Sequence, residues 1–140
     1  MSMSVIEEVM TLDPVTVDAA ETIACVARKM RDEDIGDVVV MADGRVCGIV
    51  TDRDVVVRGL AEGRDAIATK VADICSREVV TVSPGDSIDK AVELMREHSI
   101  RRLPVLASGK PVGIVSIGDL AQDRDPESAL ADISAAAPNN

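Results

Sequence analysis

Two short segments of the sequence carry a hydroxyl side chain three residues before a carboxylate. Thr51 precedes Asp54, and Ser116 precedes Asp119, each just after an apolar run. This [ST]-x-x-[DE] spacing is typical of a capping box, which opens a helix. The first turn of a helix leaves backbone N–H groups that favour an anion, and a carboxylate accepts hydrogen bonds from vicinal hydroxyls. Each segment therefore suits a ligand with vicinal hydroxyls and a phosphate. A capped helix that binds nothing is the alternative.

The two segments belong to an internal duplication of the chain. The offset is 65 residues, the separation of Asp54 from Asp119, and it holds without a gap through each half. The equivalent pairs share residue types: 15–17 with 80–82, Met30 with Met95, and 48–50 with 113–115. Only two copies are present, so two halves packed on each other are more plausible than an open solenoid.

Composition limits the kinds of ligand and partner. Apolar residues make up 46% of the 140 residues, enough for a core, but Phe, Tyr and Trp are absent. A bound base must therefore lie between aliphatic side chains. The net charge of −10 and the lack of aromatic stacking groups argue against nucleic-acid binding.

Cysteine usage and the apolar runs predict a cytoplasmic protein. Cys25, Cys47 and Cys75 are an odd number without a C-x-x-C pair, which favours reduced thiols. The first ten residues include Glu7 and Glu8 and no basic residue, so we expect no secretory signal. No apolar run approaches the ~20 residues of a membrane helix, so no membrane association is expected.

Apolar spacing predicts the same order of elements in both halves. In the first half we expect a short helix at 4–10, a strand at 15–17, a helix at 20–32, a hairpin of strands 38–41 and 46–50, and a helix at 51–60. In the second half we expect a short helix at 71–75, a strand at 79–82, a helix opened by Ser87, strands at 103–107 and 112–115, and a helix from Leu120. Asp125 could begin one more short helix.

Each half thus has the order β-α-β-β-α, a three-stranded sheet with two helices on one face. Such a sheet is too small to be stable alone. We therefore predict an α/β (α+β) fold in which two repeats pack through their small sheets with pseudo-two-fold symmetry.

These features resemble a tandem cystathionine-β-synthase (CBS) domain pair, also called a Bateman module. The resemblance rests on a G-h-h-[ST]-x-x-D motif in both halves (h is apolar), the hairpin before it, the Val-Thr-Val strand, and residues 100–105, which are similar to an I-x-R-L-P-V segment. The chain is similar to small stand-alone CBS proteins of actinobacteria. The predicted boundaries are repeat 1 at 4–61, a linker at 62–69, repeat 2 at 70–123 and a tail at 124–140.

The resemblance implies a regulatory sensor of adenosine-bearing ligands rather than an enzyme. AMP, ADP, ATP and S-adenosylmethionine are the candidate ligands, no tightly bound cofactor is expected, and the protein that reads the signal is unknown. Asp54 and Asp119 would hold the ribose, supported by Thr51 and Ser116. Six residues would border the adenine: Thr16, Val17, Ile49, Thr81, Val82 and Ile114. For the two threonines, ordinary strand preference is the alternative.

The two halves differ where the family places basic residues near phosphate. The second half has Arg101 and Arg102, whereas the first has Gly36 and Asp37. The second half is therefore expected to prefer phosphorylated ligands, and the first to be indifferent to phosphate or repelled by it. Asp37 could instead face a cationic ligand group, and the arginines could be a solvated surface pair.

Other functions stay open at this point. The resemblance implies a homodimer through helices that include Ala24, Val26, Ala91 and Leu94, so the dimer surface itself could be the function and the pockets vestigial. A metal or redox sensor would use the thiols and His98, the only histidine. No Ser-His-Asp, HExxH or P-loop pattern supports catalysis.

Overall fold

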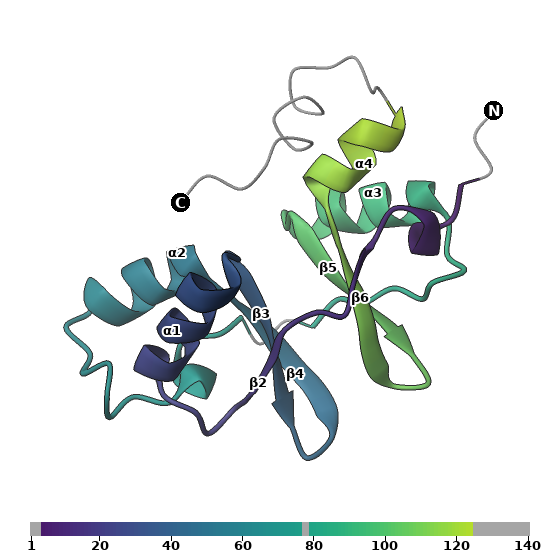
Figure 1. Ribbon diagram of the computed structural model, residues 1–140. Coiled ribbons are helices and arrows are strands. Elements are labelled where there is room, and N and C mark those ends of the chain that lie inside the picture. Colours follow the sequence, from purple (N-terminus) through teal and green to yellow (C-terminus); the bar gives the residue numbers. More distant parts are fainter. Residues whose placement is uncertain (1–3, 77–78, 125–140) are drawn as a thin grey trace. The chain divides into compact units, whose positions relative to one another are not determined.

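The computed structural model of the protein describes residues 4–76 and 79–124 (Figure 1). The chain forms two compact units. Of the described residues, the repeat-1 unit comprises 15–76 and 79, and the repeat-2 unit comprises 4–14 and 80–124. The short helix expected at Asp125 and most of the predicted tail lie outside the described residues.

The repeat-1 unit is a three-stranded sheet with helices on one side. Its strands follow the order β2-β3-β4, with β2 parallel to β3 and β3 antiparallel to β4. The elements are β2 (Thr16–Asp18), α1 (Ile23–Glu33), β3 (Asp37–Ala42), β4 (Arg45–Thr51), α2 (Asp52–Asp54), the π-helix η2 (Val55–Leu60) and the 3-10 helix η3 (Val71–Asp73). The helix predicted to run from Thr51 to Leu60 is present, but after its first turn it is a π-helix, in which the Ala61 N–H donates to the Val56 carbonyl.

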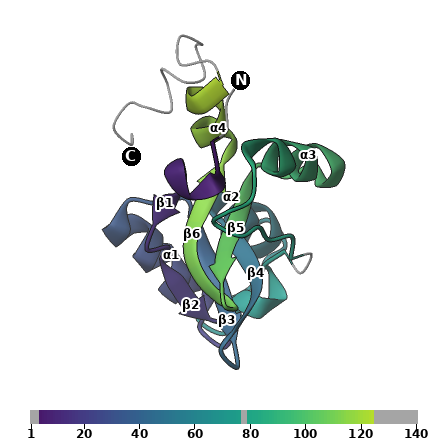
Figure 2. The same ribbon diagram turned by 90° about the vertical axis from the view of Figure 1, so that its right-hand side faces the viewer.

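The repeat-2 unit contains a sheet of the order β1-β6-β5. Its elements are the 3-10 helix η1 (Ile6–Glu8), β1 (Thr11–Leu12), α3 (Ile88–His98), β5 (Arg102–Ala107), β6 (Lys110–Ser116) and α4 (Ile117–Arg124). The strand predicted at 79–82 is reduced to one parallel bridge, between Val82 and Val105. Figure 2 shows β1 beside β6, to which it is antiparallel.

Each unit includes a short segment that, in the sequence, stands at the start of the other repeat. In the repeat-2 unit β1 pairs with β6, with Thr11 opposite Ile114. At the equivalent place in the repeat-1 unit, Ser76 forms a bridge with Ile49. We call residues 6–12 and 71–76 the exchanged segments. Both are anchored by isoleucines that are almost fully buried, Ile6 and Ile74.

Each unit has its own aliphatic core. Helix α1 contributes Ile23, Val26 and Met30, and α3 contributes the residues at the 65-residue offset, Ile88, Ala91 and Met95. The expectation that Val26 and Ala91 lie on an outer helix surface is therefore wrong, because both are fully buried. In each helix they belong to the stripe at spacings of three and four that faces the sheet.

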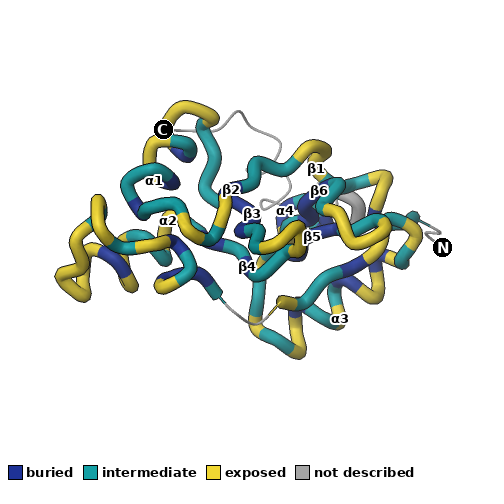
Figure 3. Tube along the Cα trace, turned by 90° about the horizontal axis from the view of Figure 1, so that it is seen from below, coloured by how far each residue is buried: buried dark blue, intermediate teal, exposed yellow. Residues whose placement is uncertain are grey.

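Most of the large apolar side chains that are exposed in the described part of the repeat-1 unit lie instead on η2 and the loop that follows. These are Val56, Val57, Leu60 and Ile67, and Val79 is exposed at the end of the unit. The loop 61–65 is exposed throughout (Figure 3). Among the described residues, none of the helices has the length and apolar character needed to cross a membrane.

Candidate functional site

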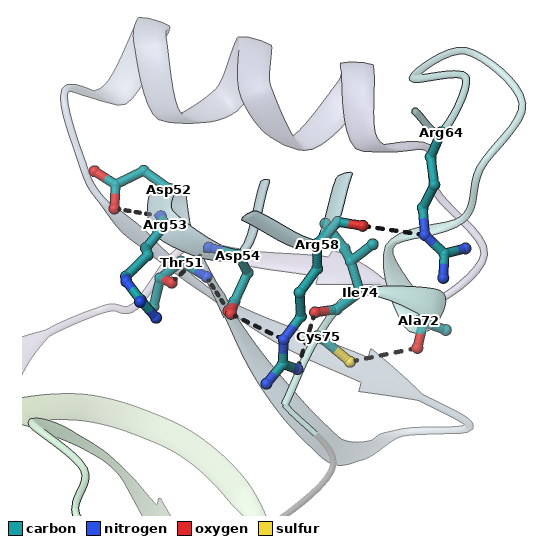
Figure 4. Close-up of polar contacts among 9 residues, drawn as sticks. All are labelled: Thr51, Asp52, Arg53, Asp54, Arg58, Arg64, Ala72, Ile74 and Cys75. Carbon is teal, nitrogen blue, oxygen red and sulfur yellow. Dashed lines mark hydrogen bonds and ion pairs between the residues drawn. The ribbon is translucent and has the colours of Figure 1, made fainter. Parts of the chain in front are cut away.

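The capping box predicted at Thr51 forms in full where β4 passes into α2. The Thr51 N–H donates to Asp54 Oδ2 at 2.9 Å, and the Asp54 N–H donates to Thr51 Oγ1 at 3.1 Å (Figure 4). These reciprocal bonds fix the rotamers of both side chains. The Asp54 carboxylate is largely covered, with 16% of its side chain exposed.

The second box has the same geometry at the junction of β6 and α4. The Ser116 N–H donates to Asp119 Oδ2 at 2.8 Å, and the Asp119 N–H donates to Ser116 Oγ at 3.2 Å. In both repeats a backbone amide thus holds one carboxylate oxygen. The second oxygen, Oδ1, is not used by the box and can accept from a ligand hydroxyl.

The residues that distinguish the two repeats lie directly beside these boxes. The Asp52 N–H donates to the Gly36 carbonyl at 3.0 Å, and the Ile117 N–H donates to the Arg101 carbonyl at 2.9 Å. In the sheets, Asp37 lies opposite Thr51 and Arg102 lies opposite Ser116. Each unit therefore brings its box together with the two residues that distinguish the repeats, Gly36 and Asp37 in the first and Arg101 and Arg102 in the second.

The charged pair of the second repeat is accessible to a ligand. Arg101 is exposed and Arg102 is half-buried. A partly exposed guanidinium can bind an anion without the full desolvation cost of a buried charge.

The predicted adenine-bordering residues divide between the two faces of each sheet. Thr16 pairs with Val39, and Val39 pairs with Ile49, so Thr16 and Ile49 lie in one row across the repeat-1 sheet. Both are half-buried. Val17 is the next residue along β2 and its side chain belongs to the core, because successive side chains of a strand point to opposite faces.

The second repeat follows the same division. Thr81 is half-buried, Val82 belongs to the core, and Ile114 is buried with 8% of its surface exposed. The side chains of Val17 and Val82 therefore point into the core, away from the surface formed by Thr16 and Ile49 or by Thr81 and Ile114. A ligand on that surface can reach their backbone more readily than their methyl groups.

Two basic residues in contact with predicted site residues of the first repeat were missed by sequence reasoning. Lys29 Nζ donates to the Thr16 carbonyl at 3.3 Å. Arg58 Nε lies 3.8 Å from Asp54 Oδ1, and Arg58 Nη1 donates to the Ile74 carbonyl at 3.5 Å (Figure 4). The i,i+4 spacing of Asp54 and Arg58 could have indicated the second of these contacts. The contact of Lys29 depends on tertiary packing and has no such signal.

The cysteines are all free and all belong to the repeat-1 unit. The Cys25 thiol donates to Glu21 Oε2 at 3.2 Å, and this carboxylate raises the pKa of Cys25. Burial raises the pKa of Cys47. Among residues 4–76 and 79–124, no three His, Cys, Asp or Glu side chains are grouped as they would be around a metal ion.

The sequence matches a known family twice, once in each repeat. The family profile described as CBS domain matches residues 6–59 and residues 71–124. The chain belongs to the CBS-domain family. Both capping boxes lie within these matches, so the duplication is one of whole CBS domains.

Several relatives have the same two-domain extent. The CBS domain-containing protein YhcV of Bacillus subtilis is 38% identical over 136 residues, which cover 94% of this chain and 96% of that protein. Hypoxic response protein 1 of Mycobacterium tuberculosis is 33% identical over 129 residues, covering 91% of this chain and 90% of the relative.

Solved structures of CBS proteins share the fold. The crystal structure of Hypoxic Response Protein I with two coordinated zinc ions has a TM-score of 0.77 at 32% identity and covers 85% of this chain and 98% of that one. The CBS domain protein PAE2072 from Pyrobaculum aerophilum complexed with AMP has a TM-score of 0.78 at 29% identity and covers 92% of this chain and 99% of that one.

Proposed function

We propose that this CBS-domain protein is a regulatory module that binds adenosine-containing ligands and carries no catalytic activity of its own. The observation that carries the proposal is the pair of identical capping boxes, each of which fixes a carboxylate with one oxygen left for a ligand. Asp54 and Asp119 are the ribose contacts, and Thr51 and Ser116 hold them in place. The AMP complex of a structurally similar CBS protein supports this class of ligand.

The adenine then lies between the strand that leads into each box and the segment at 16–17 or 81–82. Thr16 and Ile49 in the repeat-1 unit, and Thr81 and Ile114 in the repeat-2 unit, contribute side chains, while Val17 and Val82 contribute backbone. Aliphatic contacts are the only apolar contacts this chain can offer to a base, because it has no Phe, Tyr or Trp. AMP, ADP, ATP and S-adenosylmethionine all present the same adenosine to these groups.

The second-repeat site has arginines that favour a phosphate group. Arg102 lies opposite Ser116, and the Arg101 carbonyl accepts from the first amide of α4, so both arginines lie next to the second box. Charge-assisted bonds from guanidinium to phosphate are stronger than neutral ones. In a chain that also carries Asp54→Asn, so that only this site is measured, Arg101→Ala together with Arg102→Ala should remove the preference for AMP over adenosine while adenosine binding is kept. Titration at two salt concentrations tests this, because the contribution of exposed charges falls as salt rises.

Titration calorimetry with AMP tests the proposal as a whole. Each aspartate-to-alanine change should weaken its own site by about 1.5–3 kcal/mol, the typical loss of a hydrogen bond to a charged group. The double Asp54→Ala, Asp119→Ala variant should bind AMP at least about tenfold more weakly at both sites. Asparagine variants at the same positions remove the charge but keep the shape, and Glu62→Ala in the exposed loop is a surface control. An AMP affinity that is unchanged in both double variants would place the ligand elsewhere and reject the proposal.

We also propose that the protein forms a homodimer and that the dimer signals to a further, unidentified protein. The apolar side chains of Val56, Val57 and Leu60 are exposed on one helix, and an apolar surface of this kind favours association. Sedimentation equilibrium at micromolar concentration should give twice the chain mass, and Leu60→Asp should give the monomer. A monomeric mass for the wild-type protein would show that this surface does not pair two copies.

A further inference from the structure

Arg58 occupies a position between the first ribose carboxylate and an exchanged segment. The helix that begins at Asp52 continues through η2 to Leu60, so Arg58 lies one turn after Asp54 on the same face. Its Nε lies 3.8 Å from Asp54 Oδ1, the oxygen that the capping box leaves available. Its Nη1 donates to the Ile74 carbonyl at 3.5 Å, which holds the guanidinium beside the carboxylate.

The second repeat has a residue of opposite charge at the position equivalent to this arginine. The residue at the 65-residue offset is Asp123, so Asp119 is followed one turn later by an acidic residue. The Asp119 carboxylate is otherwise bonded in the same way as Asp54. The two repeats therefore differ in charge at two places. After the box, the first repeat has Arg58 where the second has an acidic residue, and before the box the first repeat lacks equivalents of Arg101 and Arg102.

We propose that Arg58 is the anion-binding residue of the first-repeat site, which thereby also takes an adenosine ligand bearing phosphate. This inference rests on the proposed function, since it assumes that Asp54 holds a ribose. It revises the expectation from Gly36 and Asp37 that the first site is indifferent to phosphate or repelled by it. The cation comes from the helix after the box rather than from the strand before it.

The chemistry of the guanidinium fits this role. It carries five N–H donors in a planar fork, and the two contacts described above are both long. More than half of the Arg58 side chain, 56%, is exposed. Donors therefore remain for phosphate oxygens. The cation also offsets part of the repulsion that Asp37, Asp52 and Asp54 would exert on an anionic ligand.

The test uses the full chain carrying Asp119→Asn, so that only the first-repeat site is measured. AMP and adenosine are titrated into this parent protein and into the same protein with Arg58→Ala or Arg58→Lys. The parent should bind AMP about tenfold more tightly than adenosine at low salt, and higher salt should reduce the ratio because the arginine is partly exposed. Arg58→Ala should bring the ratio close to one with adenosine affinity little changed. Arg58→Lys should keep part of the preference, because it keeps the charge but not the fork.

Arg53→Ala is the matched control. Arg53 is an exposed arginine on the same helix, next to Asp54 in sequence, and neighbouring residues of a helix do not face each other. It should keep the tenfold ratio. An unchanged ratio in Arg58→Ala, or an equal loss in Arg53→Ala, would overturn the role of Arg58 while adenosine binding still upholds the ribose site. If the parent binds neither ligand, the proposed function fails for this site and the role of Arg58 fails with it.

Discussion

Replacing the motif glycines by alanine should destabilise each unit by undocking its exchanged segment. A Cβ atom at Gly113 would lie 2.9 Å from the Thr11 carbonyl oxygen and 2.6 Å from Met10 Sδ. A Cβ atom at Gly48 would meet the backbone oxygen of Ser76 at closer range, with Cys75 Sγ at 3.2 Å. In both units, therefore, the glycine lets the backbone of the exchanged segment approach the sheet.

The sizes of the two effects should differ. The side chain of Met10 can rotate away, but the carbonyl oxygens belong to backbone that pairs with the sheet. Overpacking of this kind costs about 1–3 kcal/mol. We expect about 1–2 kcal/mol for Gly113→Ala and about 2–3 kcal/mol for Gly48→Ala, where the contact is closer and involves backbone. For a chain of this size these losses lower the thermal midpoint by about 3–4 °C per kcal/mol.

Thermal unfolding followed by circular dichroism measures the effect, with Gly85→Ala as the control. Gly85 has open space around its Cβ position and no positive φ. An alanine there should be neutral, or stabilising by up to about 1 kcal/mol through the entropy of the unfolded chain. Equal midpoints for Gly48→Ala and Gly85→Ala would refute the argument, because they would mean that the segment does not need the glycine in order to dock.

Three further perturbations test other contacts. Ile6→Ala should cost about 2–5 kcal/mol in chemical denaturation, as for any fully buried isoleucine, whereas Ile67→Ala, at 79% exposure, should change stability by less than about 0.5 kcal/mol. The Ser83 N–H donates to the Asp86 carboxylate and holds the pKa of Asp86 below its usual range, so the ionised carboxylate stabilises the fold above its unfolded pKa and this stabilisation disappears as pH falls through the folded pKa. Asp86→Asn should therefore cost about 1 kcal/mol of unfolding free energy at pH 7 and little at pH 2. An equal cost at both pH values would refute the charge effect. Glu21→Gln should remove the carboxylate that raises the pKa of Cys25, so more of this thiol should be ionised at pH 8. Peptide mapping after iodoacetamide treatment should then show faster labelling of Cys25, and an unchanged rate would mean that Glu21 does not set its reactivity.

Much of the fold could be predicted because its signals are local. The stripe of Ile23, Val26 and Met30 has helical spacing, and Thr22 caps that helix by accepting from the Cys25 N–H. The hairpin turn at Asp43 forms because Asp and Gly tolerate the positive φ that the turn requires. Local chemistry of this kind also predicted both capping boxes, which depend on a spacing of three residues.

The short helices of the exchanged segments were predicted, but the unit to which each segment belongs could not be, because its partners are distant in sequence. Thr11 and Leu12 are both exposed, so β1 has no apolar alternation, and its partners lie in β6. The π-helical turn of η2 is likewise invisible in a pattern of Val55, Val56 and Val57 that is compatible with an ordinary helix. The roles of Gly48 and Gly113 depend on these same distant contacts, and each appeared in the sequence only as one letter of a motif.

The exchanged segments also constrain how the chain folds as it is synthesised. Residues 6–12 are made long before β6, the strand that β1 pairs with, so Ile6 has no core to enter until Val115 has left the ribosome. The repeat-1 unit ends at residue 79, so all of its residues emerge much earlier. Vectorial synthesis therefore produces an interval in which the residues of one unit are all present while the segment before them still lacks its partner. A chaperone or a second nascent chain could capture the free segment during that interval.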